Sequence, residues 1–388
     1  MQFLFTKDAQ TPRGVYSQGV KVGKYLFCAG ARPVHPDSDL PVTGDFKTKI
    51  RCTLDNLKAV LKKGNASLED VFSACVYLRN MADKPAVDEV FREYFNEGRF
   101  PSRVIVEISR LMDNHEIEIV CSAYVPEPGE EVQCLNIEKG QMLSEPISRA
   151  VRIGQYVFCS GARAIDPDTQ ELVQGDYRQR VRQCFENLKM VLAEGGATLK
   201  DVYFTTVYVR NMADRPIVNE VMREYFQQGK FPLRIIVEIS RLVGGQDIEI
   251  DCSAYLGPKE YLKTKGGHLP TGPFSQGVRI GEYVYCSGVR PLDPLTQLLV
   301  EGDFETRVRR CLENIRAILV KGEADFSQVY TTTVYLRNMV NLPVVDKVFK
   351  EYFKKECYPV RHVVEINRLN EGHDLEIACS AYLGVPGA

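Results

Sequence analysis

Two stretches of alternating apolar and polar residues, close together in the sequence, occur three times along the chain. In residues 102–108, positions 104, 106 and 108 are apolar and share one face of a predicted strand, whereas Arg103 lies on the other face. The next alternating stretch, residues 116–124, carries Glu118. Both stretches return at residues 231–255 and 358–382. An interval of about 130 residues is longer than the unit of a solenoid, so each copy is predicted to be a domain.

Helical periodicity and further strands complete each copy. Asp45 precedes apolar residues spaced three and four apart, which predicts a helix that Gly64 ends in a left-handed conformation. Pro85 opens a second predicted helix. Two short strands are predicted within residues 19–30 and one over residues 71–78. The element order is therefore β-β-α-β-α-β-β, an α+β domain with both helices on one face of a mainly antiparallel sheet.

This pattern divides the chain into three domains joined by short polar linkers. The domains are predicted over residues 1–125, 132–256 and 262–388. A sheet with helices on one face needs cover for its other face. The sister domains supply this cover if they close a pseudo-threefold ring with the sheets inside and the helices outside. Three independent domains on a string are the alternative.

The balance of charged residues argues against a nucleic-acid partner. The chain has 49 basic and 51 acidic residues and a net charge of −2. It contains no run of about 18–20 apolar residues, the length that spans a bilayer. The N-terminus lacks the basic and apolar stretches of a signal peptide. The sequence therefore predicts a cytoplasmic protein with no membrane partner.

Cysteine and histidine placement favours neither a disulfide framework nor a metal site. Nine of the twelve cysteines recur at equivalent positions inside apolar patterns, and none forms a Cys-x-x-Cys pair. They are predicted to be buried apolar side chains. The five histidines share no position common to all three copies, so they are predicted to lie on the surface or in turns.

The strand arginine and the glutamate of the following strand are the candidate reactive groups. In the three copies they are Arg103, Arg234 and Arg361, and Glu118, Glu249 and Glu376. A plain ion pair between neighbouring strands is the alternative interpretation. The glutamates four positions after each arginine are predicted to be structural: Glu107, Glu238 and Glu365.

Several short motifs resemble those of the RidA (YjgF) family of reactive-intermediate deaminases. In the first copy they are Tyr16-Ser-Gln-Gly19, Phe27-Cys-Ala-Gly-Ala-Arg-Pro33, Asp55-Asn56-Leu57, Val76-Tyr-Leu78, Phe100-Pro-Ser-Arg103 and Ile117-Glu-Ile119. The resemblance covers almost the whole of each copy. It implies a chorismate-mutase-like fold. Because the family forms homotrimers with clefts between subunits, it also implies a trimer-like assembly within one monomeric chain.

The resemblance further implies hydrolysis of 2-imino or enamine acids, such as 2-aminoacrylate, to 2-keto acids and ammonia. No cofactor is expected, because a protonated imine is already electrophilic. The three arginines would hold the substrate carboxylate, which suits a rigid two-pronged guanidinium. The three glutamates would position or activate the attacking water. Further substrate contacts are implied for Tyr16 and Phe274 and for the glycines Gly30, Gly161 and Gly288.

The copies also depart from the family pattern. Phe274 lacks the hydroxyl of Tyr16, and the second copy has Ile147 there. The clefts are therefore predicted to be unequal, with the cleft served by Tyr16 the most active. Three further arginines either enter the clefts or are solvated or paired at an interface: Arg32, Arg163 and Arg290. The competing functions are a carboxylate-sensing module without turnover and an endoribonuclease or translation inhibitor, of which the latter is disfavoured by the acidic balance and the unrepeated histidines.

Overall fold

A computed structural model describes residues 1–136 and 145–384, and it contains three similar α+β units. The first unit consists of β1 (Gln2–Leu4), β2 (Gly19–Val22), β3 (Tyr25–Cys28), α1 (Phe46–Lys63), β4 (Val71–Leu78), α2 (Lys84–Tyr94), β5 (Ser102–Glu107) and β6 (Ile117–Tyr124). The α+β class is confirmed. The short edge strand β1 was missed, because three residues are too few to show an alternating pattern.

The second and third units repeat this order of elements. The second has β7 (Val132–Leu135), β8 (Ala150–Ile153), β9 (Tyr156–Cys159), β10 (Ala162–Arg163), α3 (Tyr177–Glu194), β11 (Val202–Val209), α4 (Arg215–Tyr225), β12 (Leu233–Glu238) and β13 (Ile248–Tyr255). The third has β14 (Glu260–Leu262), β15 (Gly277–Ile280), β16 (Tyr283–Cys286), α5 (Phe304–Lys321), β17 (Val329–Leu336), α6 (Leu342–Tyr352), β18 (Val360–Glu365) and β19 (Leu375–Tyr382).

Each sheet is mixed, with one parallel pair at one edge. The strand order in the first sheet is β1-β2-β3-β6-β4-β5, and only β4 and β5 run parallel. The parallel crossover runs through α2, as a βαβ connection requires. This topology places the arginine strand β5 at the edge and the glutamate strand β6 in the middle of the sheet.

Helix α1 begins where the sequence predicts, but the predicted conformation of the residue at its end is wrong. The Asp45 side chain accepts a hydrogen bond from the Thr48 N–H and caps the helix. Gly64 has φ −88°, so the predicted left-handed conformation is wrong. That conformation belongs to the next residue, Asn65, with φ 59°. Gly64 is needed for space instead, because a Cβ there would lie 1.9 Å from the Leu26 side chain on β3.

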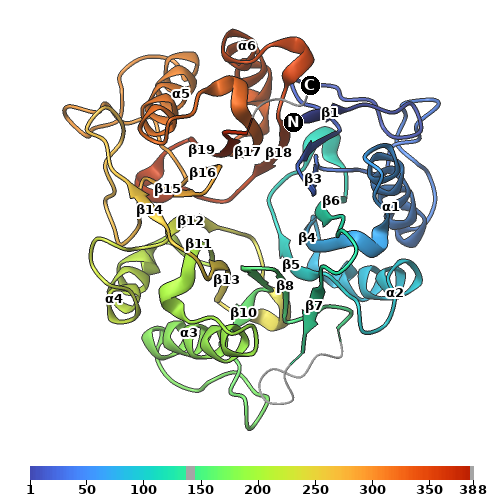
Figure 1. Ribbon diagram of the computed structural model, residues 1–388, viewed down its shortest axis with the longest axis horizontal. Coiled ribbons are helices and arrows are strands. Elements are labelled where there is room, and N and C mark those ends of the chain that lie inside the picture. Colours follow the sequence, from blue (N-terminus) through green and yellow to red (C-terminus); the bar gives the residue numbers. More distant parts are fainter. Residues whose placement is uncertain (137–144, 385–388) are drawn as a thin grey trace.

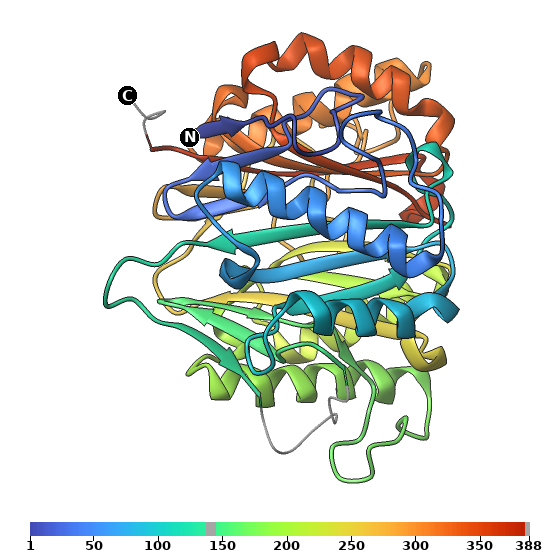
Figure 2. The same ribbon diagram turned by 90° about the vertical axis from the view of Figure 1, so that its right-hand side faces the viewer.

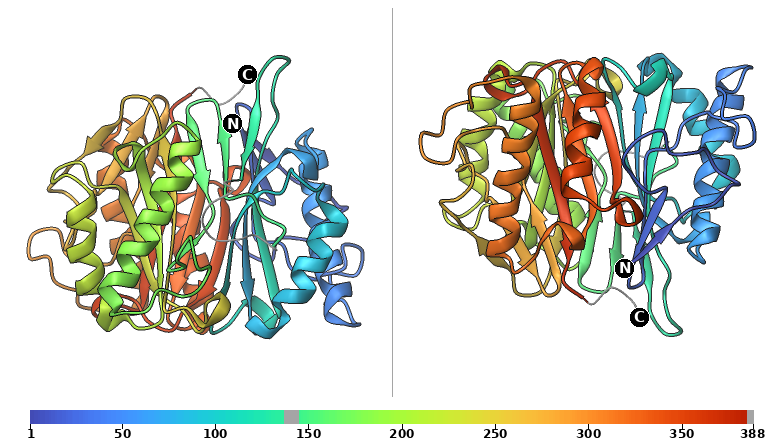
Figure 3. Two further views of the ribbon diagram at one scale, coloured as in Figure 1. Left: turned by 90° about the horizontal axis from the view of Figure 1, so that it is seen from below. Right: turned by 90° about the horizontal axis from the view of Figure 1, so that it is seen from above.

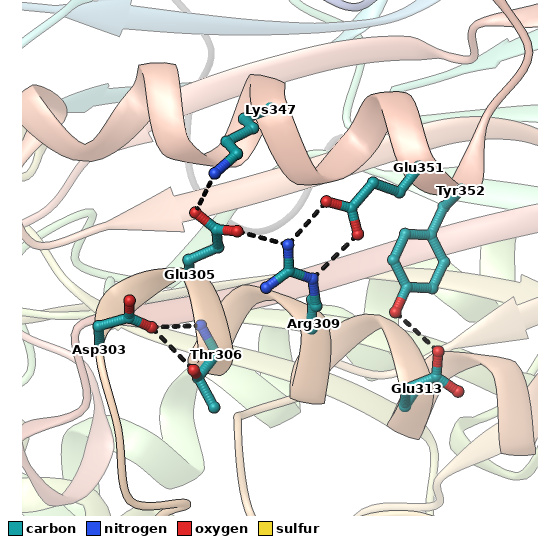
Figure 4. Close-up of polar contacts among 8 residues, drawn as sticks. All are labelled: Asp303, Glu305, Thr306, Arg309, Glu313, Lys347, Glu351 and Tyr352. Atoms are coloured by element: carbon teal, nitrogen blue, oxygen red, sulfur yellow. Dashed lines mark hydrogen bonds and ion pairs between the residues drawn. The ribbon is translucent and has the colours of Figure 1, made fainter.

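Polar contacts join the two helices of each unit along their exposed sides. In the third unit, Arg309 on α5 donates two hydrogen bonds to the Glu351 carboxylate on α6, and the Tyr352 hydroxyl donates to Glu313 (Figure 4). The same arginine–glutamate pair recurs in the first unit between Arg51 and Glu93. These contacts keep both helices in register on one face of the sheet.

The three units surround a common centre, with the helices at the periphery and the strands toward the middle (Figure 1). The other views agree, since the helices lie outside the strands in each (Figures 2 and 3). Val104, Ile235 and Val364, one from each unit, belong to a single buried apolar cluster between the sheets. Backbone bridges join each unit to both others: Glu107–Arg241, Arg110–Glu365 and Glu238–Arg368.

A cavity of about 220 Å³ lies among the three sheets. Its lining is apolar in part but also includes Cys75 from β4, Asp251 from β13 and His362 from β18. Burial raises the pKa of Asp251 to about 7 and lowers that of His362 to about 4. Both groups therefore favour their neutral forms inside the protein.

One histidine contradicts the prediction: His362 lies within strand β18 and lines the central cavity. His115, His268 and His373 lie in connecting segments between the helices and strands, but they are buried. Most of the cysteines are buried as predicted, and all twelve are free thiols. Among the described helices, none is long and apolar enough to cross a membrane.

Candidate active site

In two of the three sites, the backbone of the candidate arginine contacts the glycine that covers the glutamate of the next unit, so residues of two units come together at the boundary between them. The Arg103 carbonyl on β5 accepts a hydrogen bond from the Gly161 N–H of the second unit at 3.5 Å, and Gly161 covers Glu249. The Arg234 carbonyl accepts in the same way from Gly288 at 3.3 Å, and Gly288 covers Glu376.

The third arginine is matched with the first unit. Arg361 approaches Gly14, where a Cβ would lie 2.9 Å from the guanidinium, and its Cζ lies 5.8 Å from the centre of the Tyr16 ring. We name the sites by their arginine and glutamate: the first cleft is Arg103 with Glu249, the second is Arg234 with Glu376, and the third is Arg361 with Glu118.

The glutamates are buried beneath glycines. A Cβ on Gly30, Gly161 or Gly288 would lie only 1.9–2.0 Å from the carboxylate oxygen of the glutamate below it. These glycines are therefore required by contact with the glutamate, not by backbone conformation. Burial raises the pKa of all three carboxyl groups to about 7, although a neighbouring arginine opposes the shift in each case.

The three arginines are buried as well. Each is held by a residue on the second helix of its own unit: Arg103 Nη2 lies 2.6 Å from Asp88 Oδ1, and Arg361 Nη2 lies 2.5 Å from Asp346 Oδ1. In the second cleft, Arg234 Nη1 instead donates to Asn219 Oδ1 at 2.7 Å. The alternative of an ion pair between strand arginine and next-strand glutamate does not occur at Arg103, Arg234 or Arg361 among the described residues.

In two clefts an aromatic ring packs against the pocket arginine. The Phe274 ring lies 5.1 Å from Arg234 Cζ, and Tyr16 lies under Arg361. Ile147 takes the corresponding buried place in the first cleft. The Tyr16 hydroxyl is engaged by Arg32, whose Nη2 lies 3.1 Å away.

The open question of the three further arginines is answered by their contacts. Arg32 and Arg290 are buried, and Arg163 pairs with Glu145 at 3.2 Å. Each lowers the pKa of the glutamate in its own cleft, which places its charge beside that carboxylate. They belong to the clefts and not to the solvent.

Sequence reasoning missed the residues that the helices bring to the clefts. The second helix of each unit supplies one residue that contacts the pocket arginine: Asp88, Asn219 and Asp346. Lys84 and Arg215 lie at the starts of α2 and α4. Glu145 lies in the segment before β8, and His268 and Thr271 lie in the segment before β15. The three helix residues occupy equivalent positions, and the change from Asp to Asn was the available signal. The glutamates after each arginine are structural: Glu107 Oε2, for example, accepts from the Met81 N–H at 2.7 Å.

The chain belongs to the family described as Endoribonuclease L-PSP, which matches three times, at residues 6–125, 141–256 and 267–383. Its relatives are RutC and RidA proteins. A RutC family protein of Pyrococcus horikoshii is 44% identical over 123 residues, which are 32% of this chain and 97% of that protein. A 2-iminobutanoate/2-iminopropanoate deaminase of Dermatophagoides farinae is 37% identical over 106 residues, 27% of this chain and 82% of that protein.

Solved structures match one unit at a time. RidA from the Antarctic bacterium Psychrobacter sp. PAMC 21119 is 31% identical, with a TM-score of 0.31, and covers 32% of this chain and 98% of its own. The two sequence relatives cover 32% and 27% of the present chain, which carries the family domain in three successive copies.

Proposed function

We propose that the chain hydrolyses 2-imino and enamine acids to 2-keto acids and ammonia. The observation that carries this proposal is the buried glutamate with a pKa near 7, enclosed by a glycine and facing a buried arginine across the boundary between units. The activity named for the Dermatophagoides farinae relative supports the same reaction. Cytoplasmic localisation remains an expectation from the sequence.

The arginine would fix the substrate by its carboxylate. A guanidinium donates two parallel hydrogen bonds to a carboxylate, which also orients the adjacent C2 carbon. Because the arginine and the glutamate come from different units, the substrate would lie between them. An enamine acid would first tautomerise to the imine.

The glutamate would act as the base. In its ionised form it takes a proton from water while the water oxygen bonds to C2, and the C=N π electrons move to nitrogen. The protonated glutamate then returns the proton to the amine. The C–N bond breaks as the hydroxyl becomes a carbonyl, and the hydroxyl proton leaves through the glutamate, so one iminium and one water give a keto acid and ammonium.

The test is imine loss in a coupled assay. An amino-acid oxidase generates 2-iminobutanoate in situ, and semicarbazide trapping follows its disappearance. We expect the chain to accelerate loss of the imine. The triple variant Glu118→Gln, Glu249→Gln, Glu376→Gln is expected to be folded and inactive. If the wild-type chain leaves the imine lifetime unchanged although it binds 2-ketobutyrate, it is a binding module and not an enzyme.

A further inference from the structure

The three clefts differ in the charge that surrounds the pocket arginine. In the first and third clefts an aspartate carboxylate contacts the guanidinium, from Asp88 and Asp346 respectively. In the second cleft the equivalent contact is the neutral amide of Asn219. Among the described residues, no carboxylate lies within ion-pair distance of Arg234.

The first cleft contains a second internal carboxylate. Where the other clefts have Gly14 or Gly272 close to the arginine, the second unit has Glu145. The Glu145 carboxylate lies 3.3 Å from Lys84 and 3.2 Å from Arg163. Burial alone would raise its pKa, but Arg163, Lys84 and Arg103 together hold the pKa below its usual value. A carboxylate from the chain itself thus meets the cations of this cleft.

The second cleft has the opposite balance. Burial and the nearby Arg215 and Arg290 lower the pKa of Arg234 to about 9, although Glu376 opposes this shift. Arg215 and Arg290 both donate to a single neutral acceptor, the Thr271 hydroxyl, at 2.9 Å each. Glu371 is the acidic partner of these two arginines, at 3.7 Å and 3.1 Å, and it does not contact Arg234.

The second cleft also adjoins open space. A surface cavity of about 540 Å³ is lined by Arg215 and Glu371, together with residues at the start of α4 and in the turn before β19. Glu371 forms an ion pair with the cleft residue Arg290, and Arg215 lies near Arg290 and pairs with Glu371. The cavity therefore lies at the edge of the cleft. A small anion can therefore approach from the solvent toward a concentration of positive charge.

We propose, resting on the function above, that the second cleft is the one carboxylate-binding and catalytic cleft of the chain. Asn219 selects this cleft, because its neutral amide leaves the charge of Arg234 free to attract the substrate carboxylate. In the other clefts the arginine is already neutralised by an internal carboxylate. Arg103 Nη1 and Arg361 Nη1 lack hydrogen-bond partners among the described residues, so they can still donate to a neutral ligand. A second carboxylate is attracted much less, because it is repelled by the first. This ranking differs from the prediction from the sequence that the cleft served by Tyr16 is the most active.

The chain offers reciprocal variants as a test, with 2-ketobutyrate as the probe in titration calorimetry. The wild-type chain should bind one molecule. Asn219→Asp, which nearly preserves side-chain shape, should weaken binding at least tenfold and lower imine turnover in parallel. Asp346→Asn should create a second binding site. Circular dichroism and thermal unfolding establish that each variant is folded.

Three equal sites in the wild-type chain, unchanged affinity in Asn219→Asp, or no binding by the wild-type chain would each overturn this inference. The proposed function is judged separately by turnover. A chain that hydrolyses the imine at full rate in Asn219→Asp retains the function and loses the inference. A chain that binds one keto acid, loses it in Asn219→Asp and hydrolyses no imine retains the inference and loses the function.

Discussion

At the scale of single residues, a glycine and a glutamate in each cleft fit so closely that no larger residue can replace the glycine unless the glutamate moves. Alanine at Gly288 would place its Cβ 1.9 Å from the Glu376 carboxylate. The carboxylate must then move away from the position where it would meet water. Gly288 does not have a positive φ, so alanine fits the backbone conformation. The substitution conflicts only with the neighbouring Glu376 side chain.

We therefore expect Gly288→Ala to reduce imine turnover at least tenfold, since a catalytic base displaced by about 1 Å loses much of its effect. The measurement is kcat at saturating substrate. Gly30→Ala, which imposes the same conflict on Glu118 in the third cleft, is the matched control and reports how much that cleft contributes. Equal kcat for Gly288→Ala and the wild-type chain would contradict the placement of Glu376 at the reaction centre.

The pKa of Glu376 gives turnover a defined pH dependence. The base must be ionised, and burial raises the pKa of this carboxyl group to about 7. kcat should therefore rise as the pH increases through 7 and become constant above about 8. A profile of kcat from pH 5.5 to 9 checks this, and Glu376→Gln should remove the rise together with the activity. A kcat that is flat between pH 5.5 and 7 would contradict a base with this pKa.

Repetition and alternation were enough to find Arg103 and Glu118, because a strand has only two faces and the motif returned three times. The family resemblance implied clefts between the units, but the sequence did not show which glutamate shares a cleft with which arginine. It also did not show that Asp88 and Asn219 contact the arginines, because the partner of a helix residue depends on how the helix packs on the sheet. The local pattern of residues predicts on which face of a helix or strand a side chain lies. It does not predict which side chain of another element it contacts.

At the scale of elements, strand β13 carries an acid where its sister strands carry apolar residues. Asp251 corresponds to Val120 on β6 and Ala378 on β19, and it lines the central cavity. Its carboxylate accepts a hydrogen bond from the Thr206 N–H at 3.3 Å. The acid is half-buried at the cavity, and loss of solvation raises its pKa to about 7.

Asp251→Asn should therefore stabilise the protein at pH 8 more than at pH 5. The unfolded chain ionises Asp251 above its ordinary pKa near 4, whereas the folded chain resists ionisation until about pH 7. Wild-type stability is thus lost progressively between these pH values, and the amide variant avoids this loss. The gain reaches up to about 4 kcal/mol above pH 7. Urea unfolding at both pH values measures it, and an equal difference at pH 5 and pH 8 would contradict the assigned burial cost.

Most elements could be predicted because their apolar periods are long enough to read. Helix α1 has 18 residues and a capping aspartate, and its start was predicted correctly. Strand β1 has three residues and pairs only with β2, so its sequence carries no usable period. The burial of His115, His268 and His373 was not predicted for a related reason, since a polar residue in a turn is buried only when another segment covers it.

At the scale of the whole molecule, every unit already makes contacts with two others. The apolar cluster between the sheets includes residues of all three units, and backbone bridges link the units in pairs. A trimer of separate subunits would form these contacts between chains, whereas this chain forms them within itself.

We therefore expect a monomer of 43.9 kDa in solution. Light scattering coupled to gel filtration, across a hundredfold range of protein concentration, checks the mass. A stable mass near three chains would show that the contacts between units within one chain leave a surface that still associates with other chains. A single-unit fragment is the informative comparison, because it exposes the apolar face that the other units cover and should associate or aggregate.

Because the three units are separate stretches of one chain, a mutation can alter one cleft and leave another unchanged. In an assembly of identical subunits, one codon change alters every cleft at once, and a harmful change has no unaffected copy to fall back on. Here the codon for Asn219 alters the second cleft alone. A cleft that has lost its activity can remain as scaffold while the second cleft works, and three neighbouring sites in one molecule can diverge toward three different ligands.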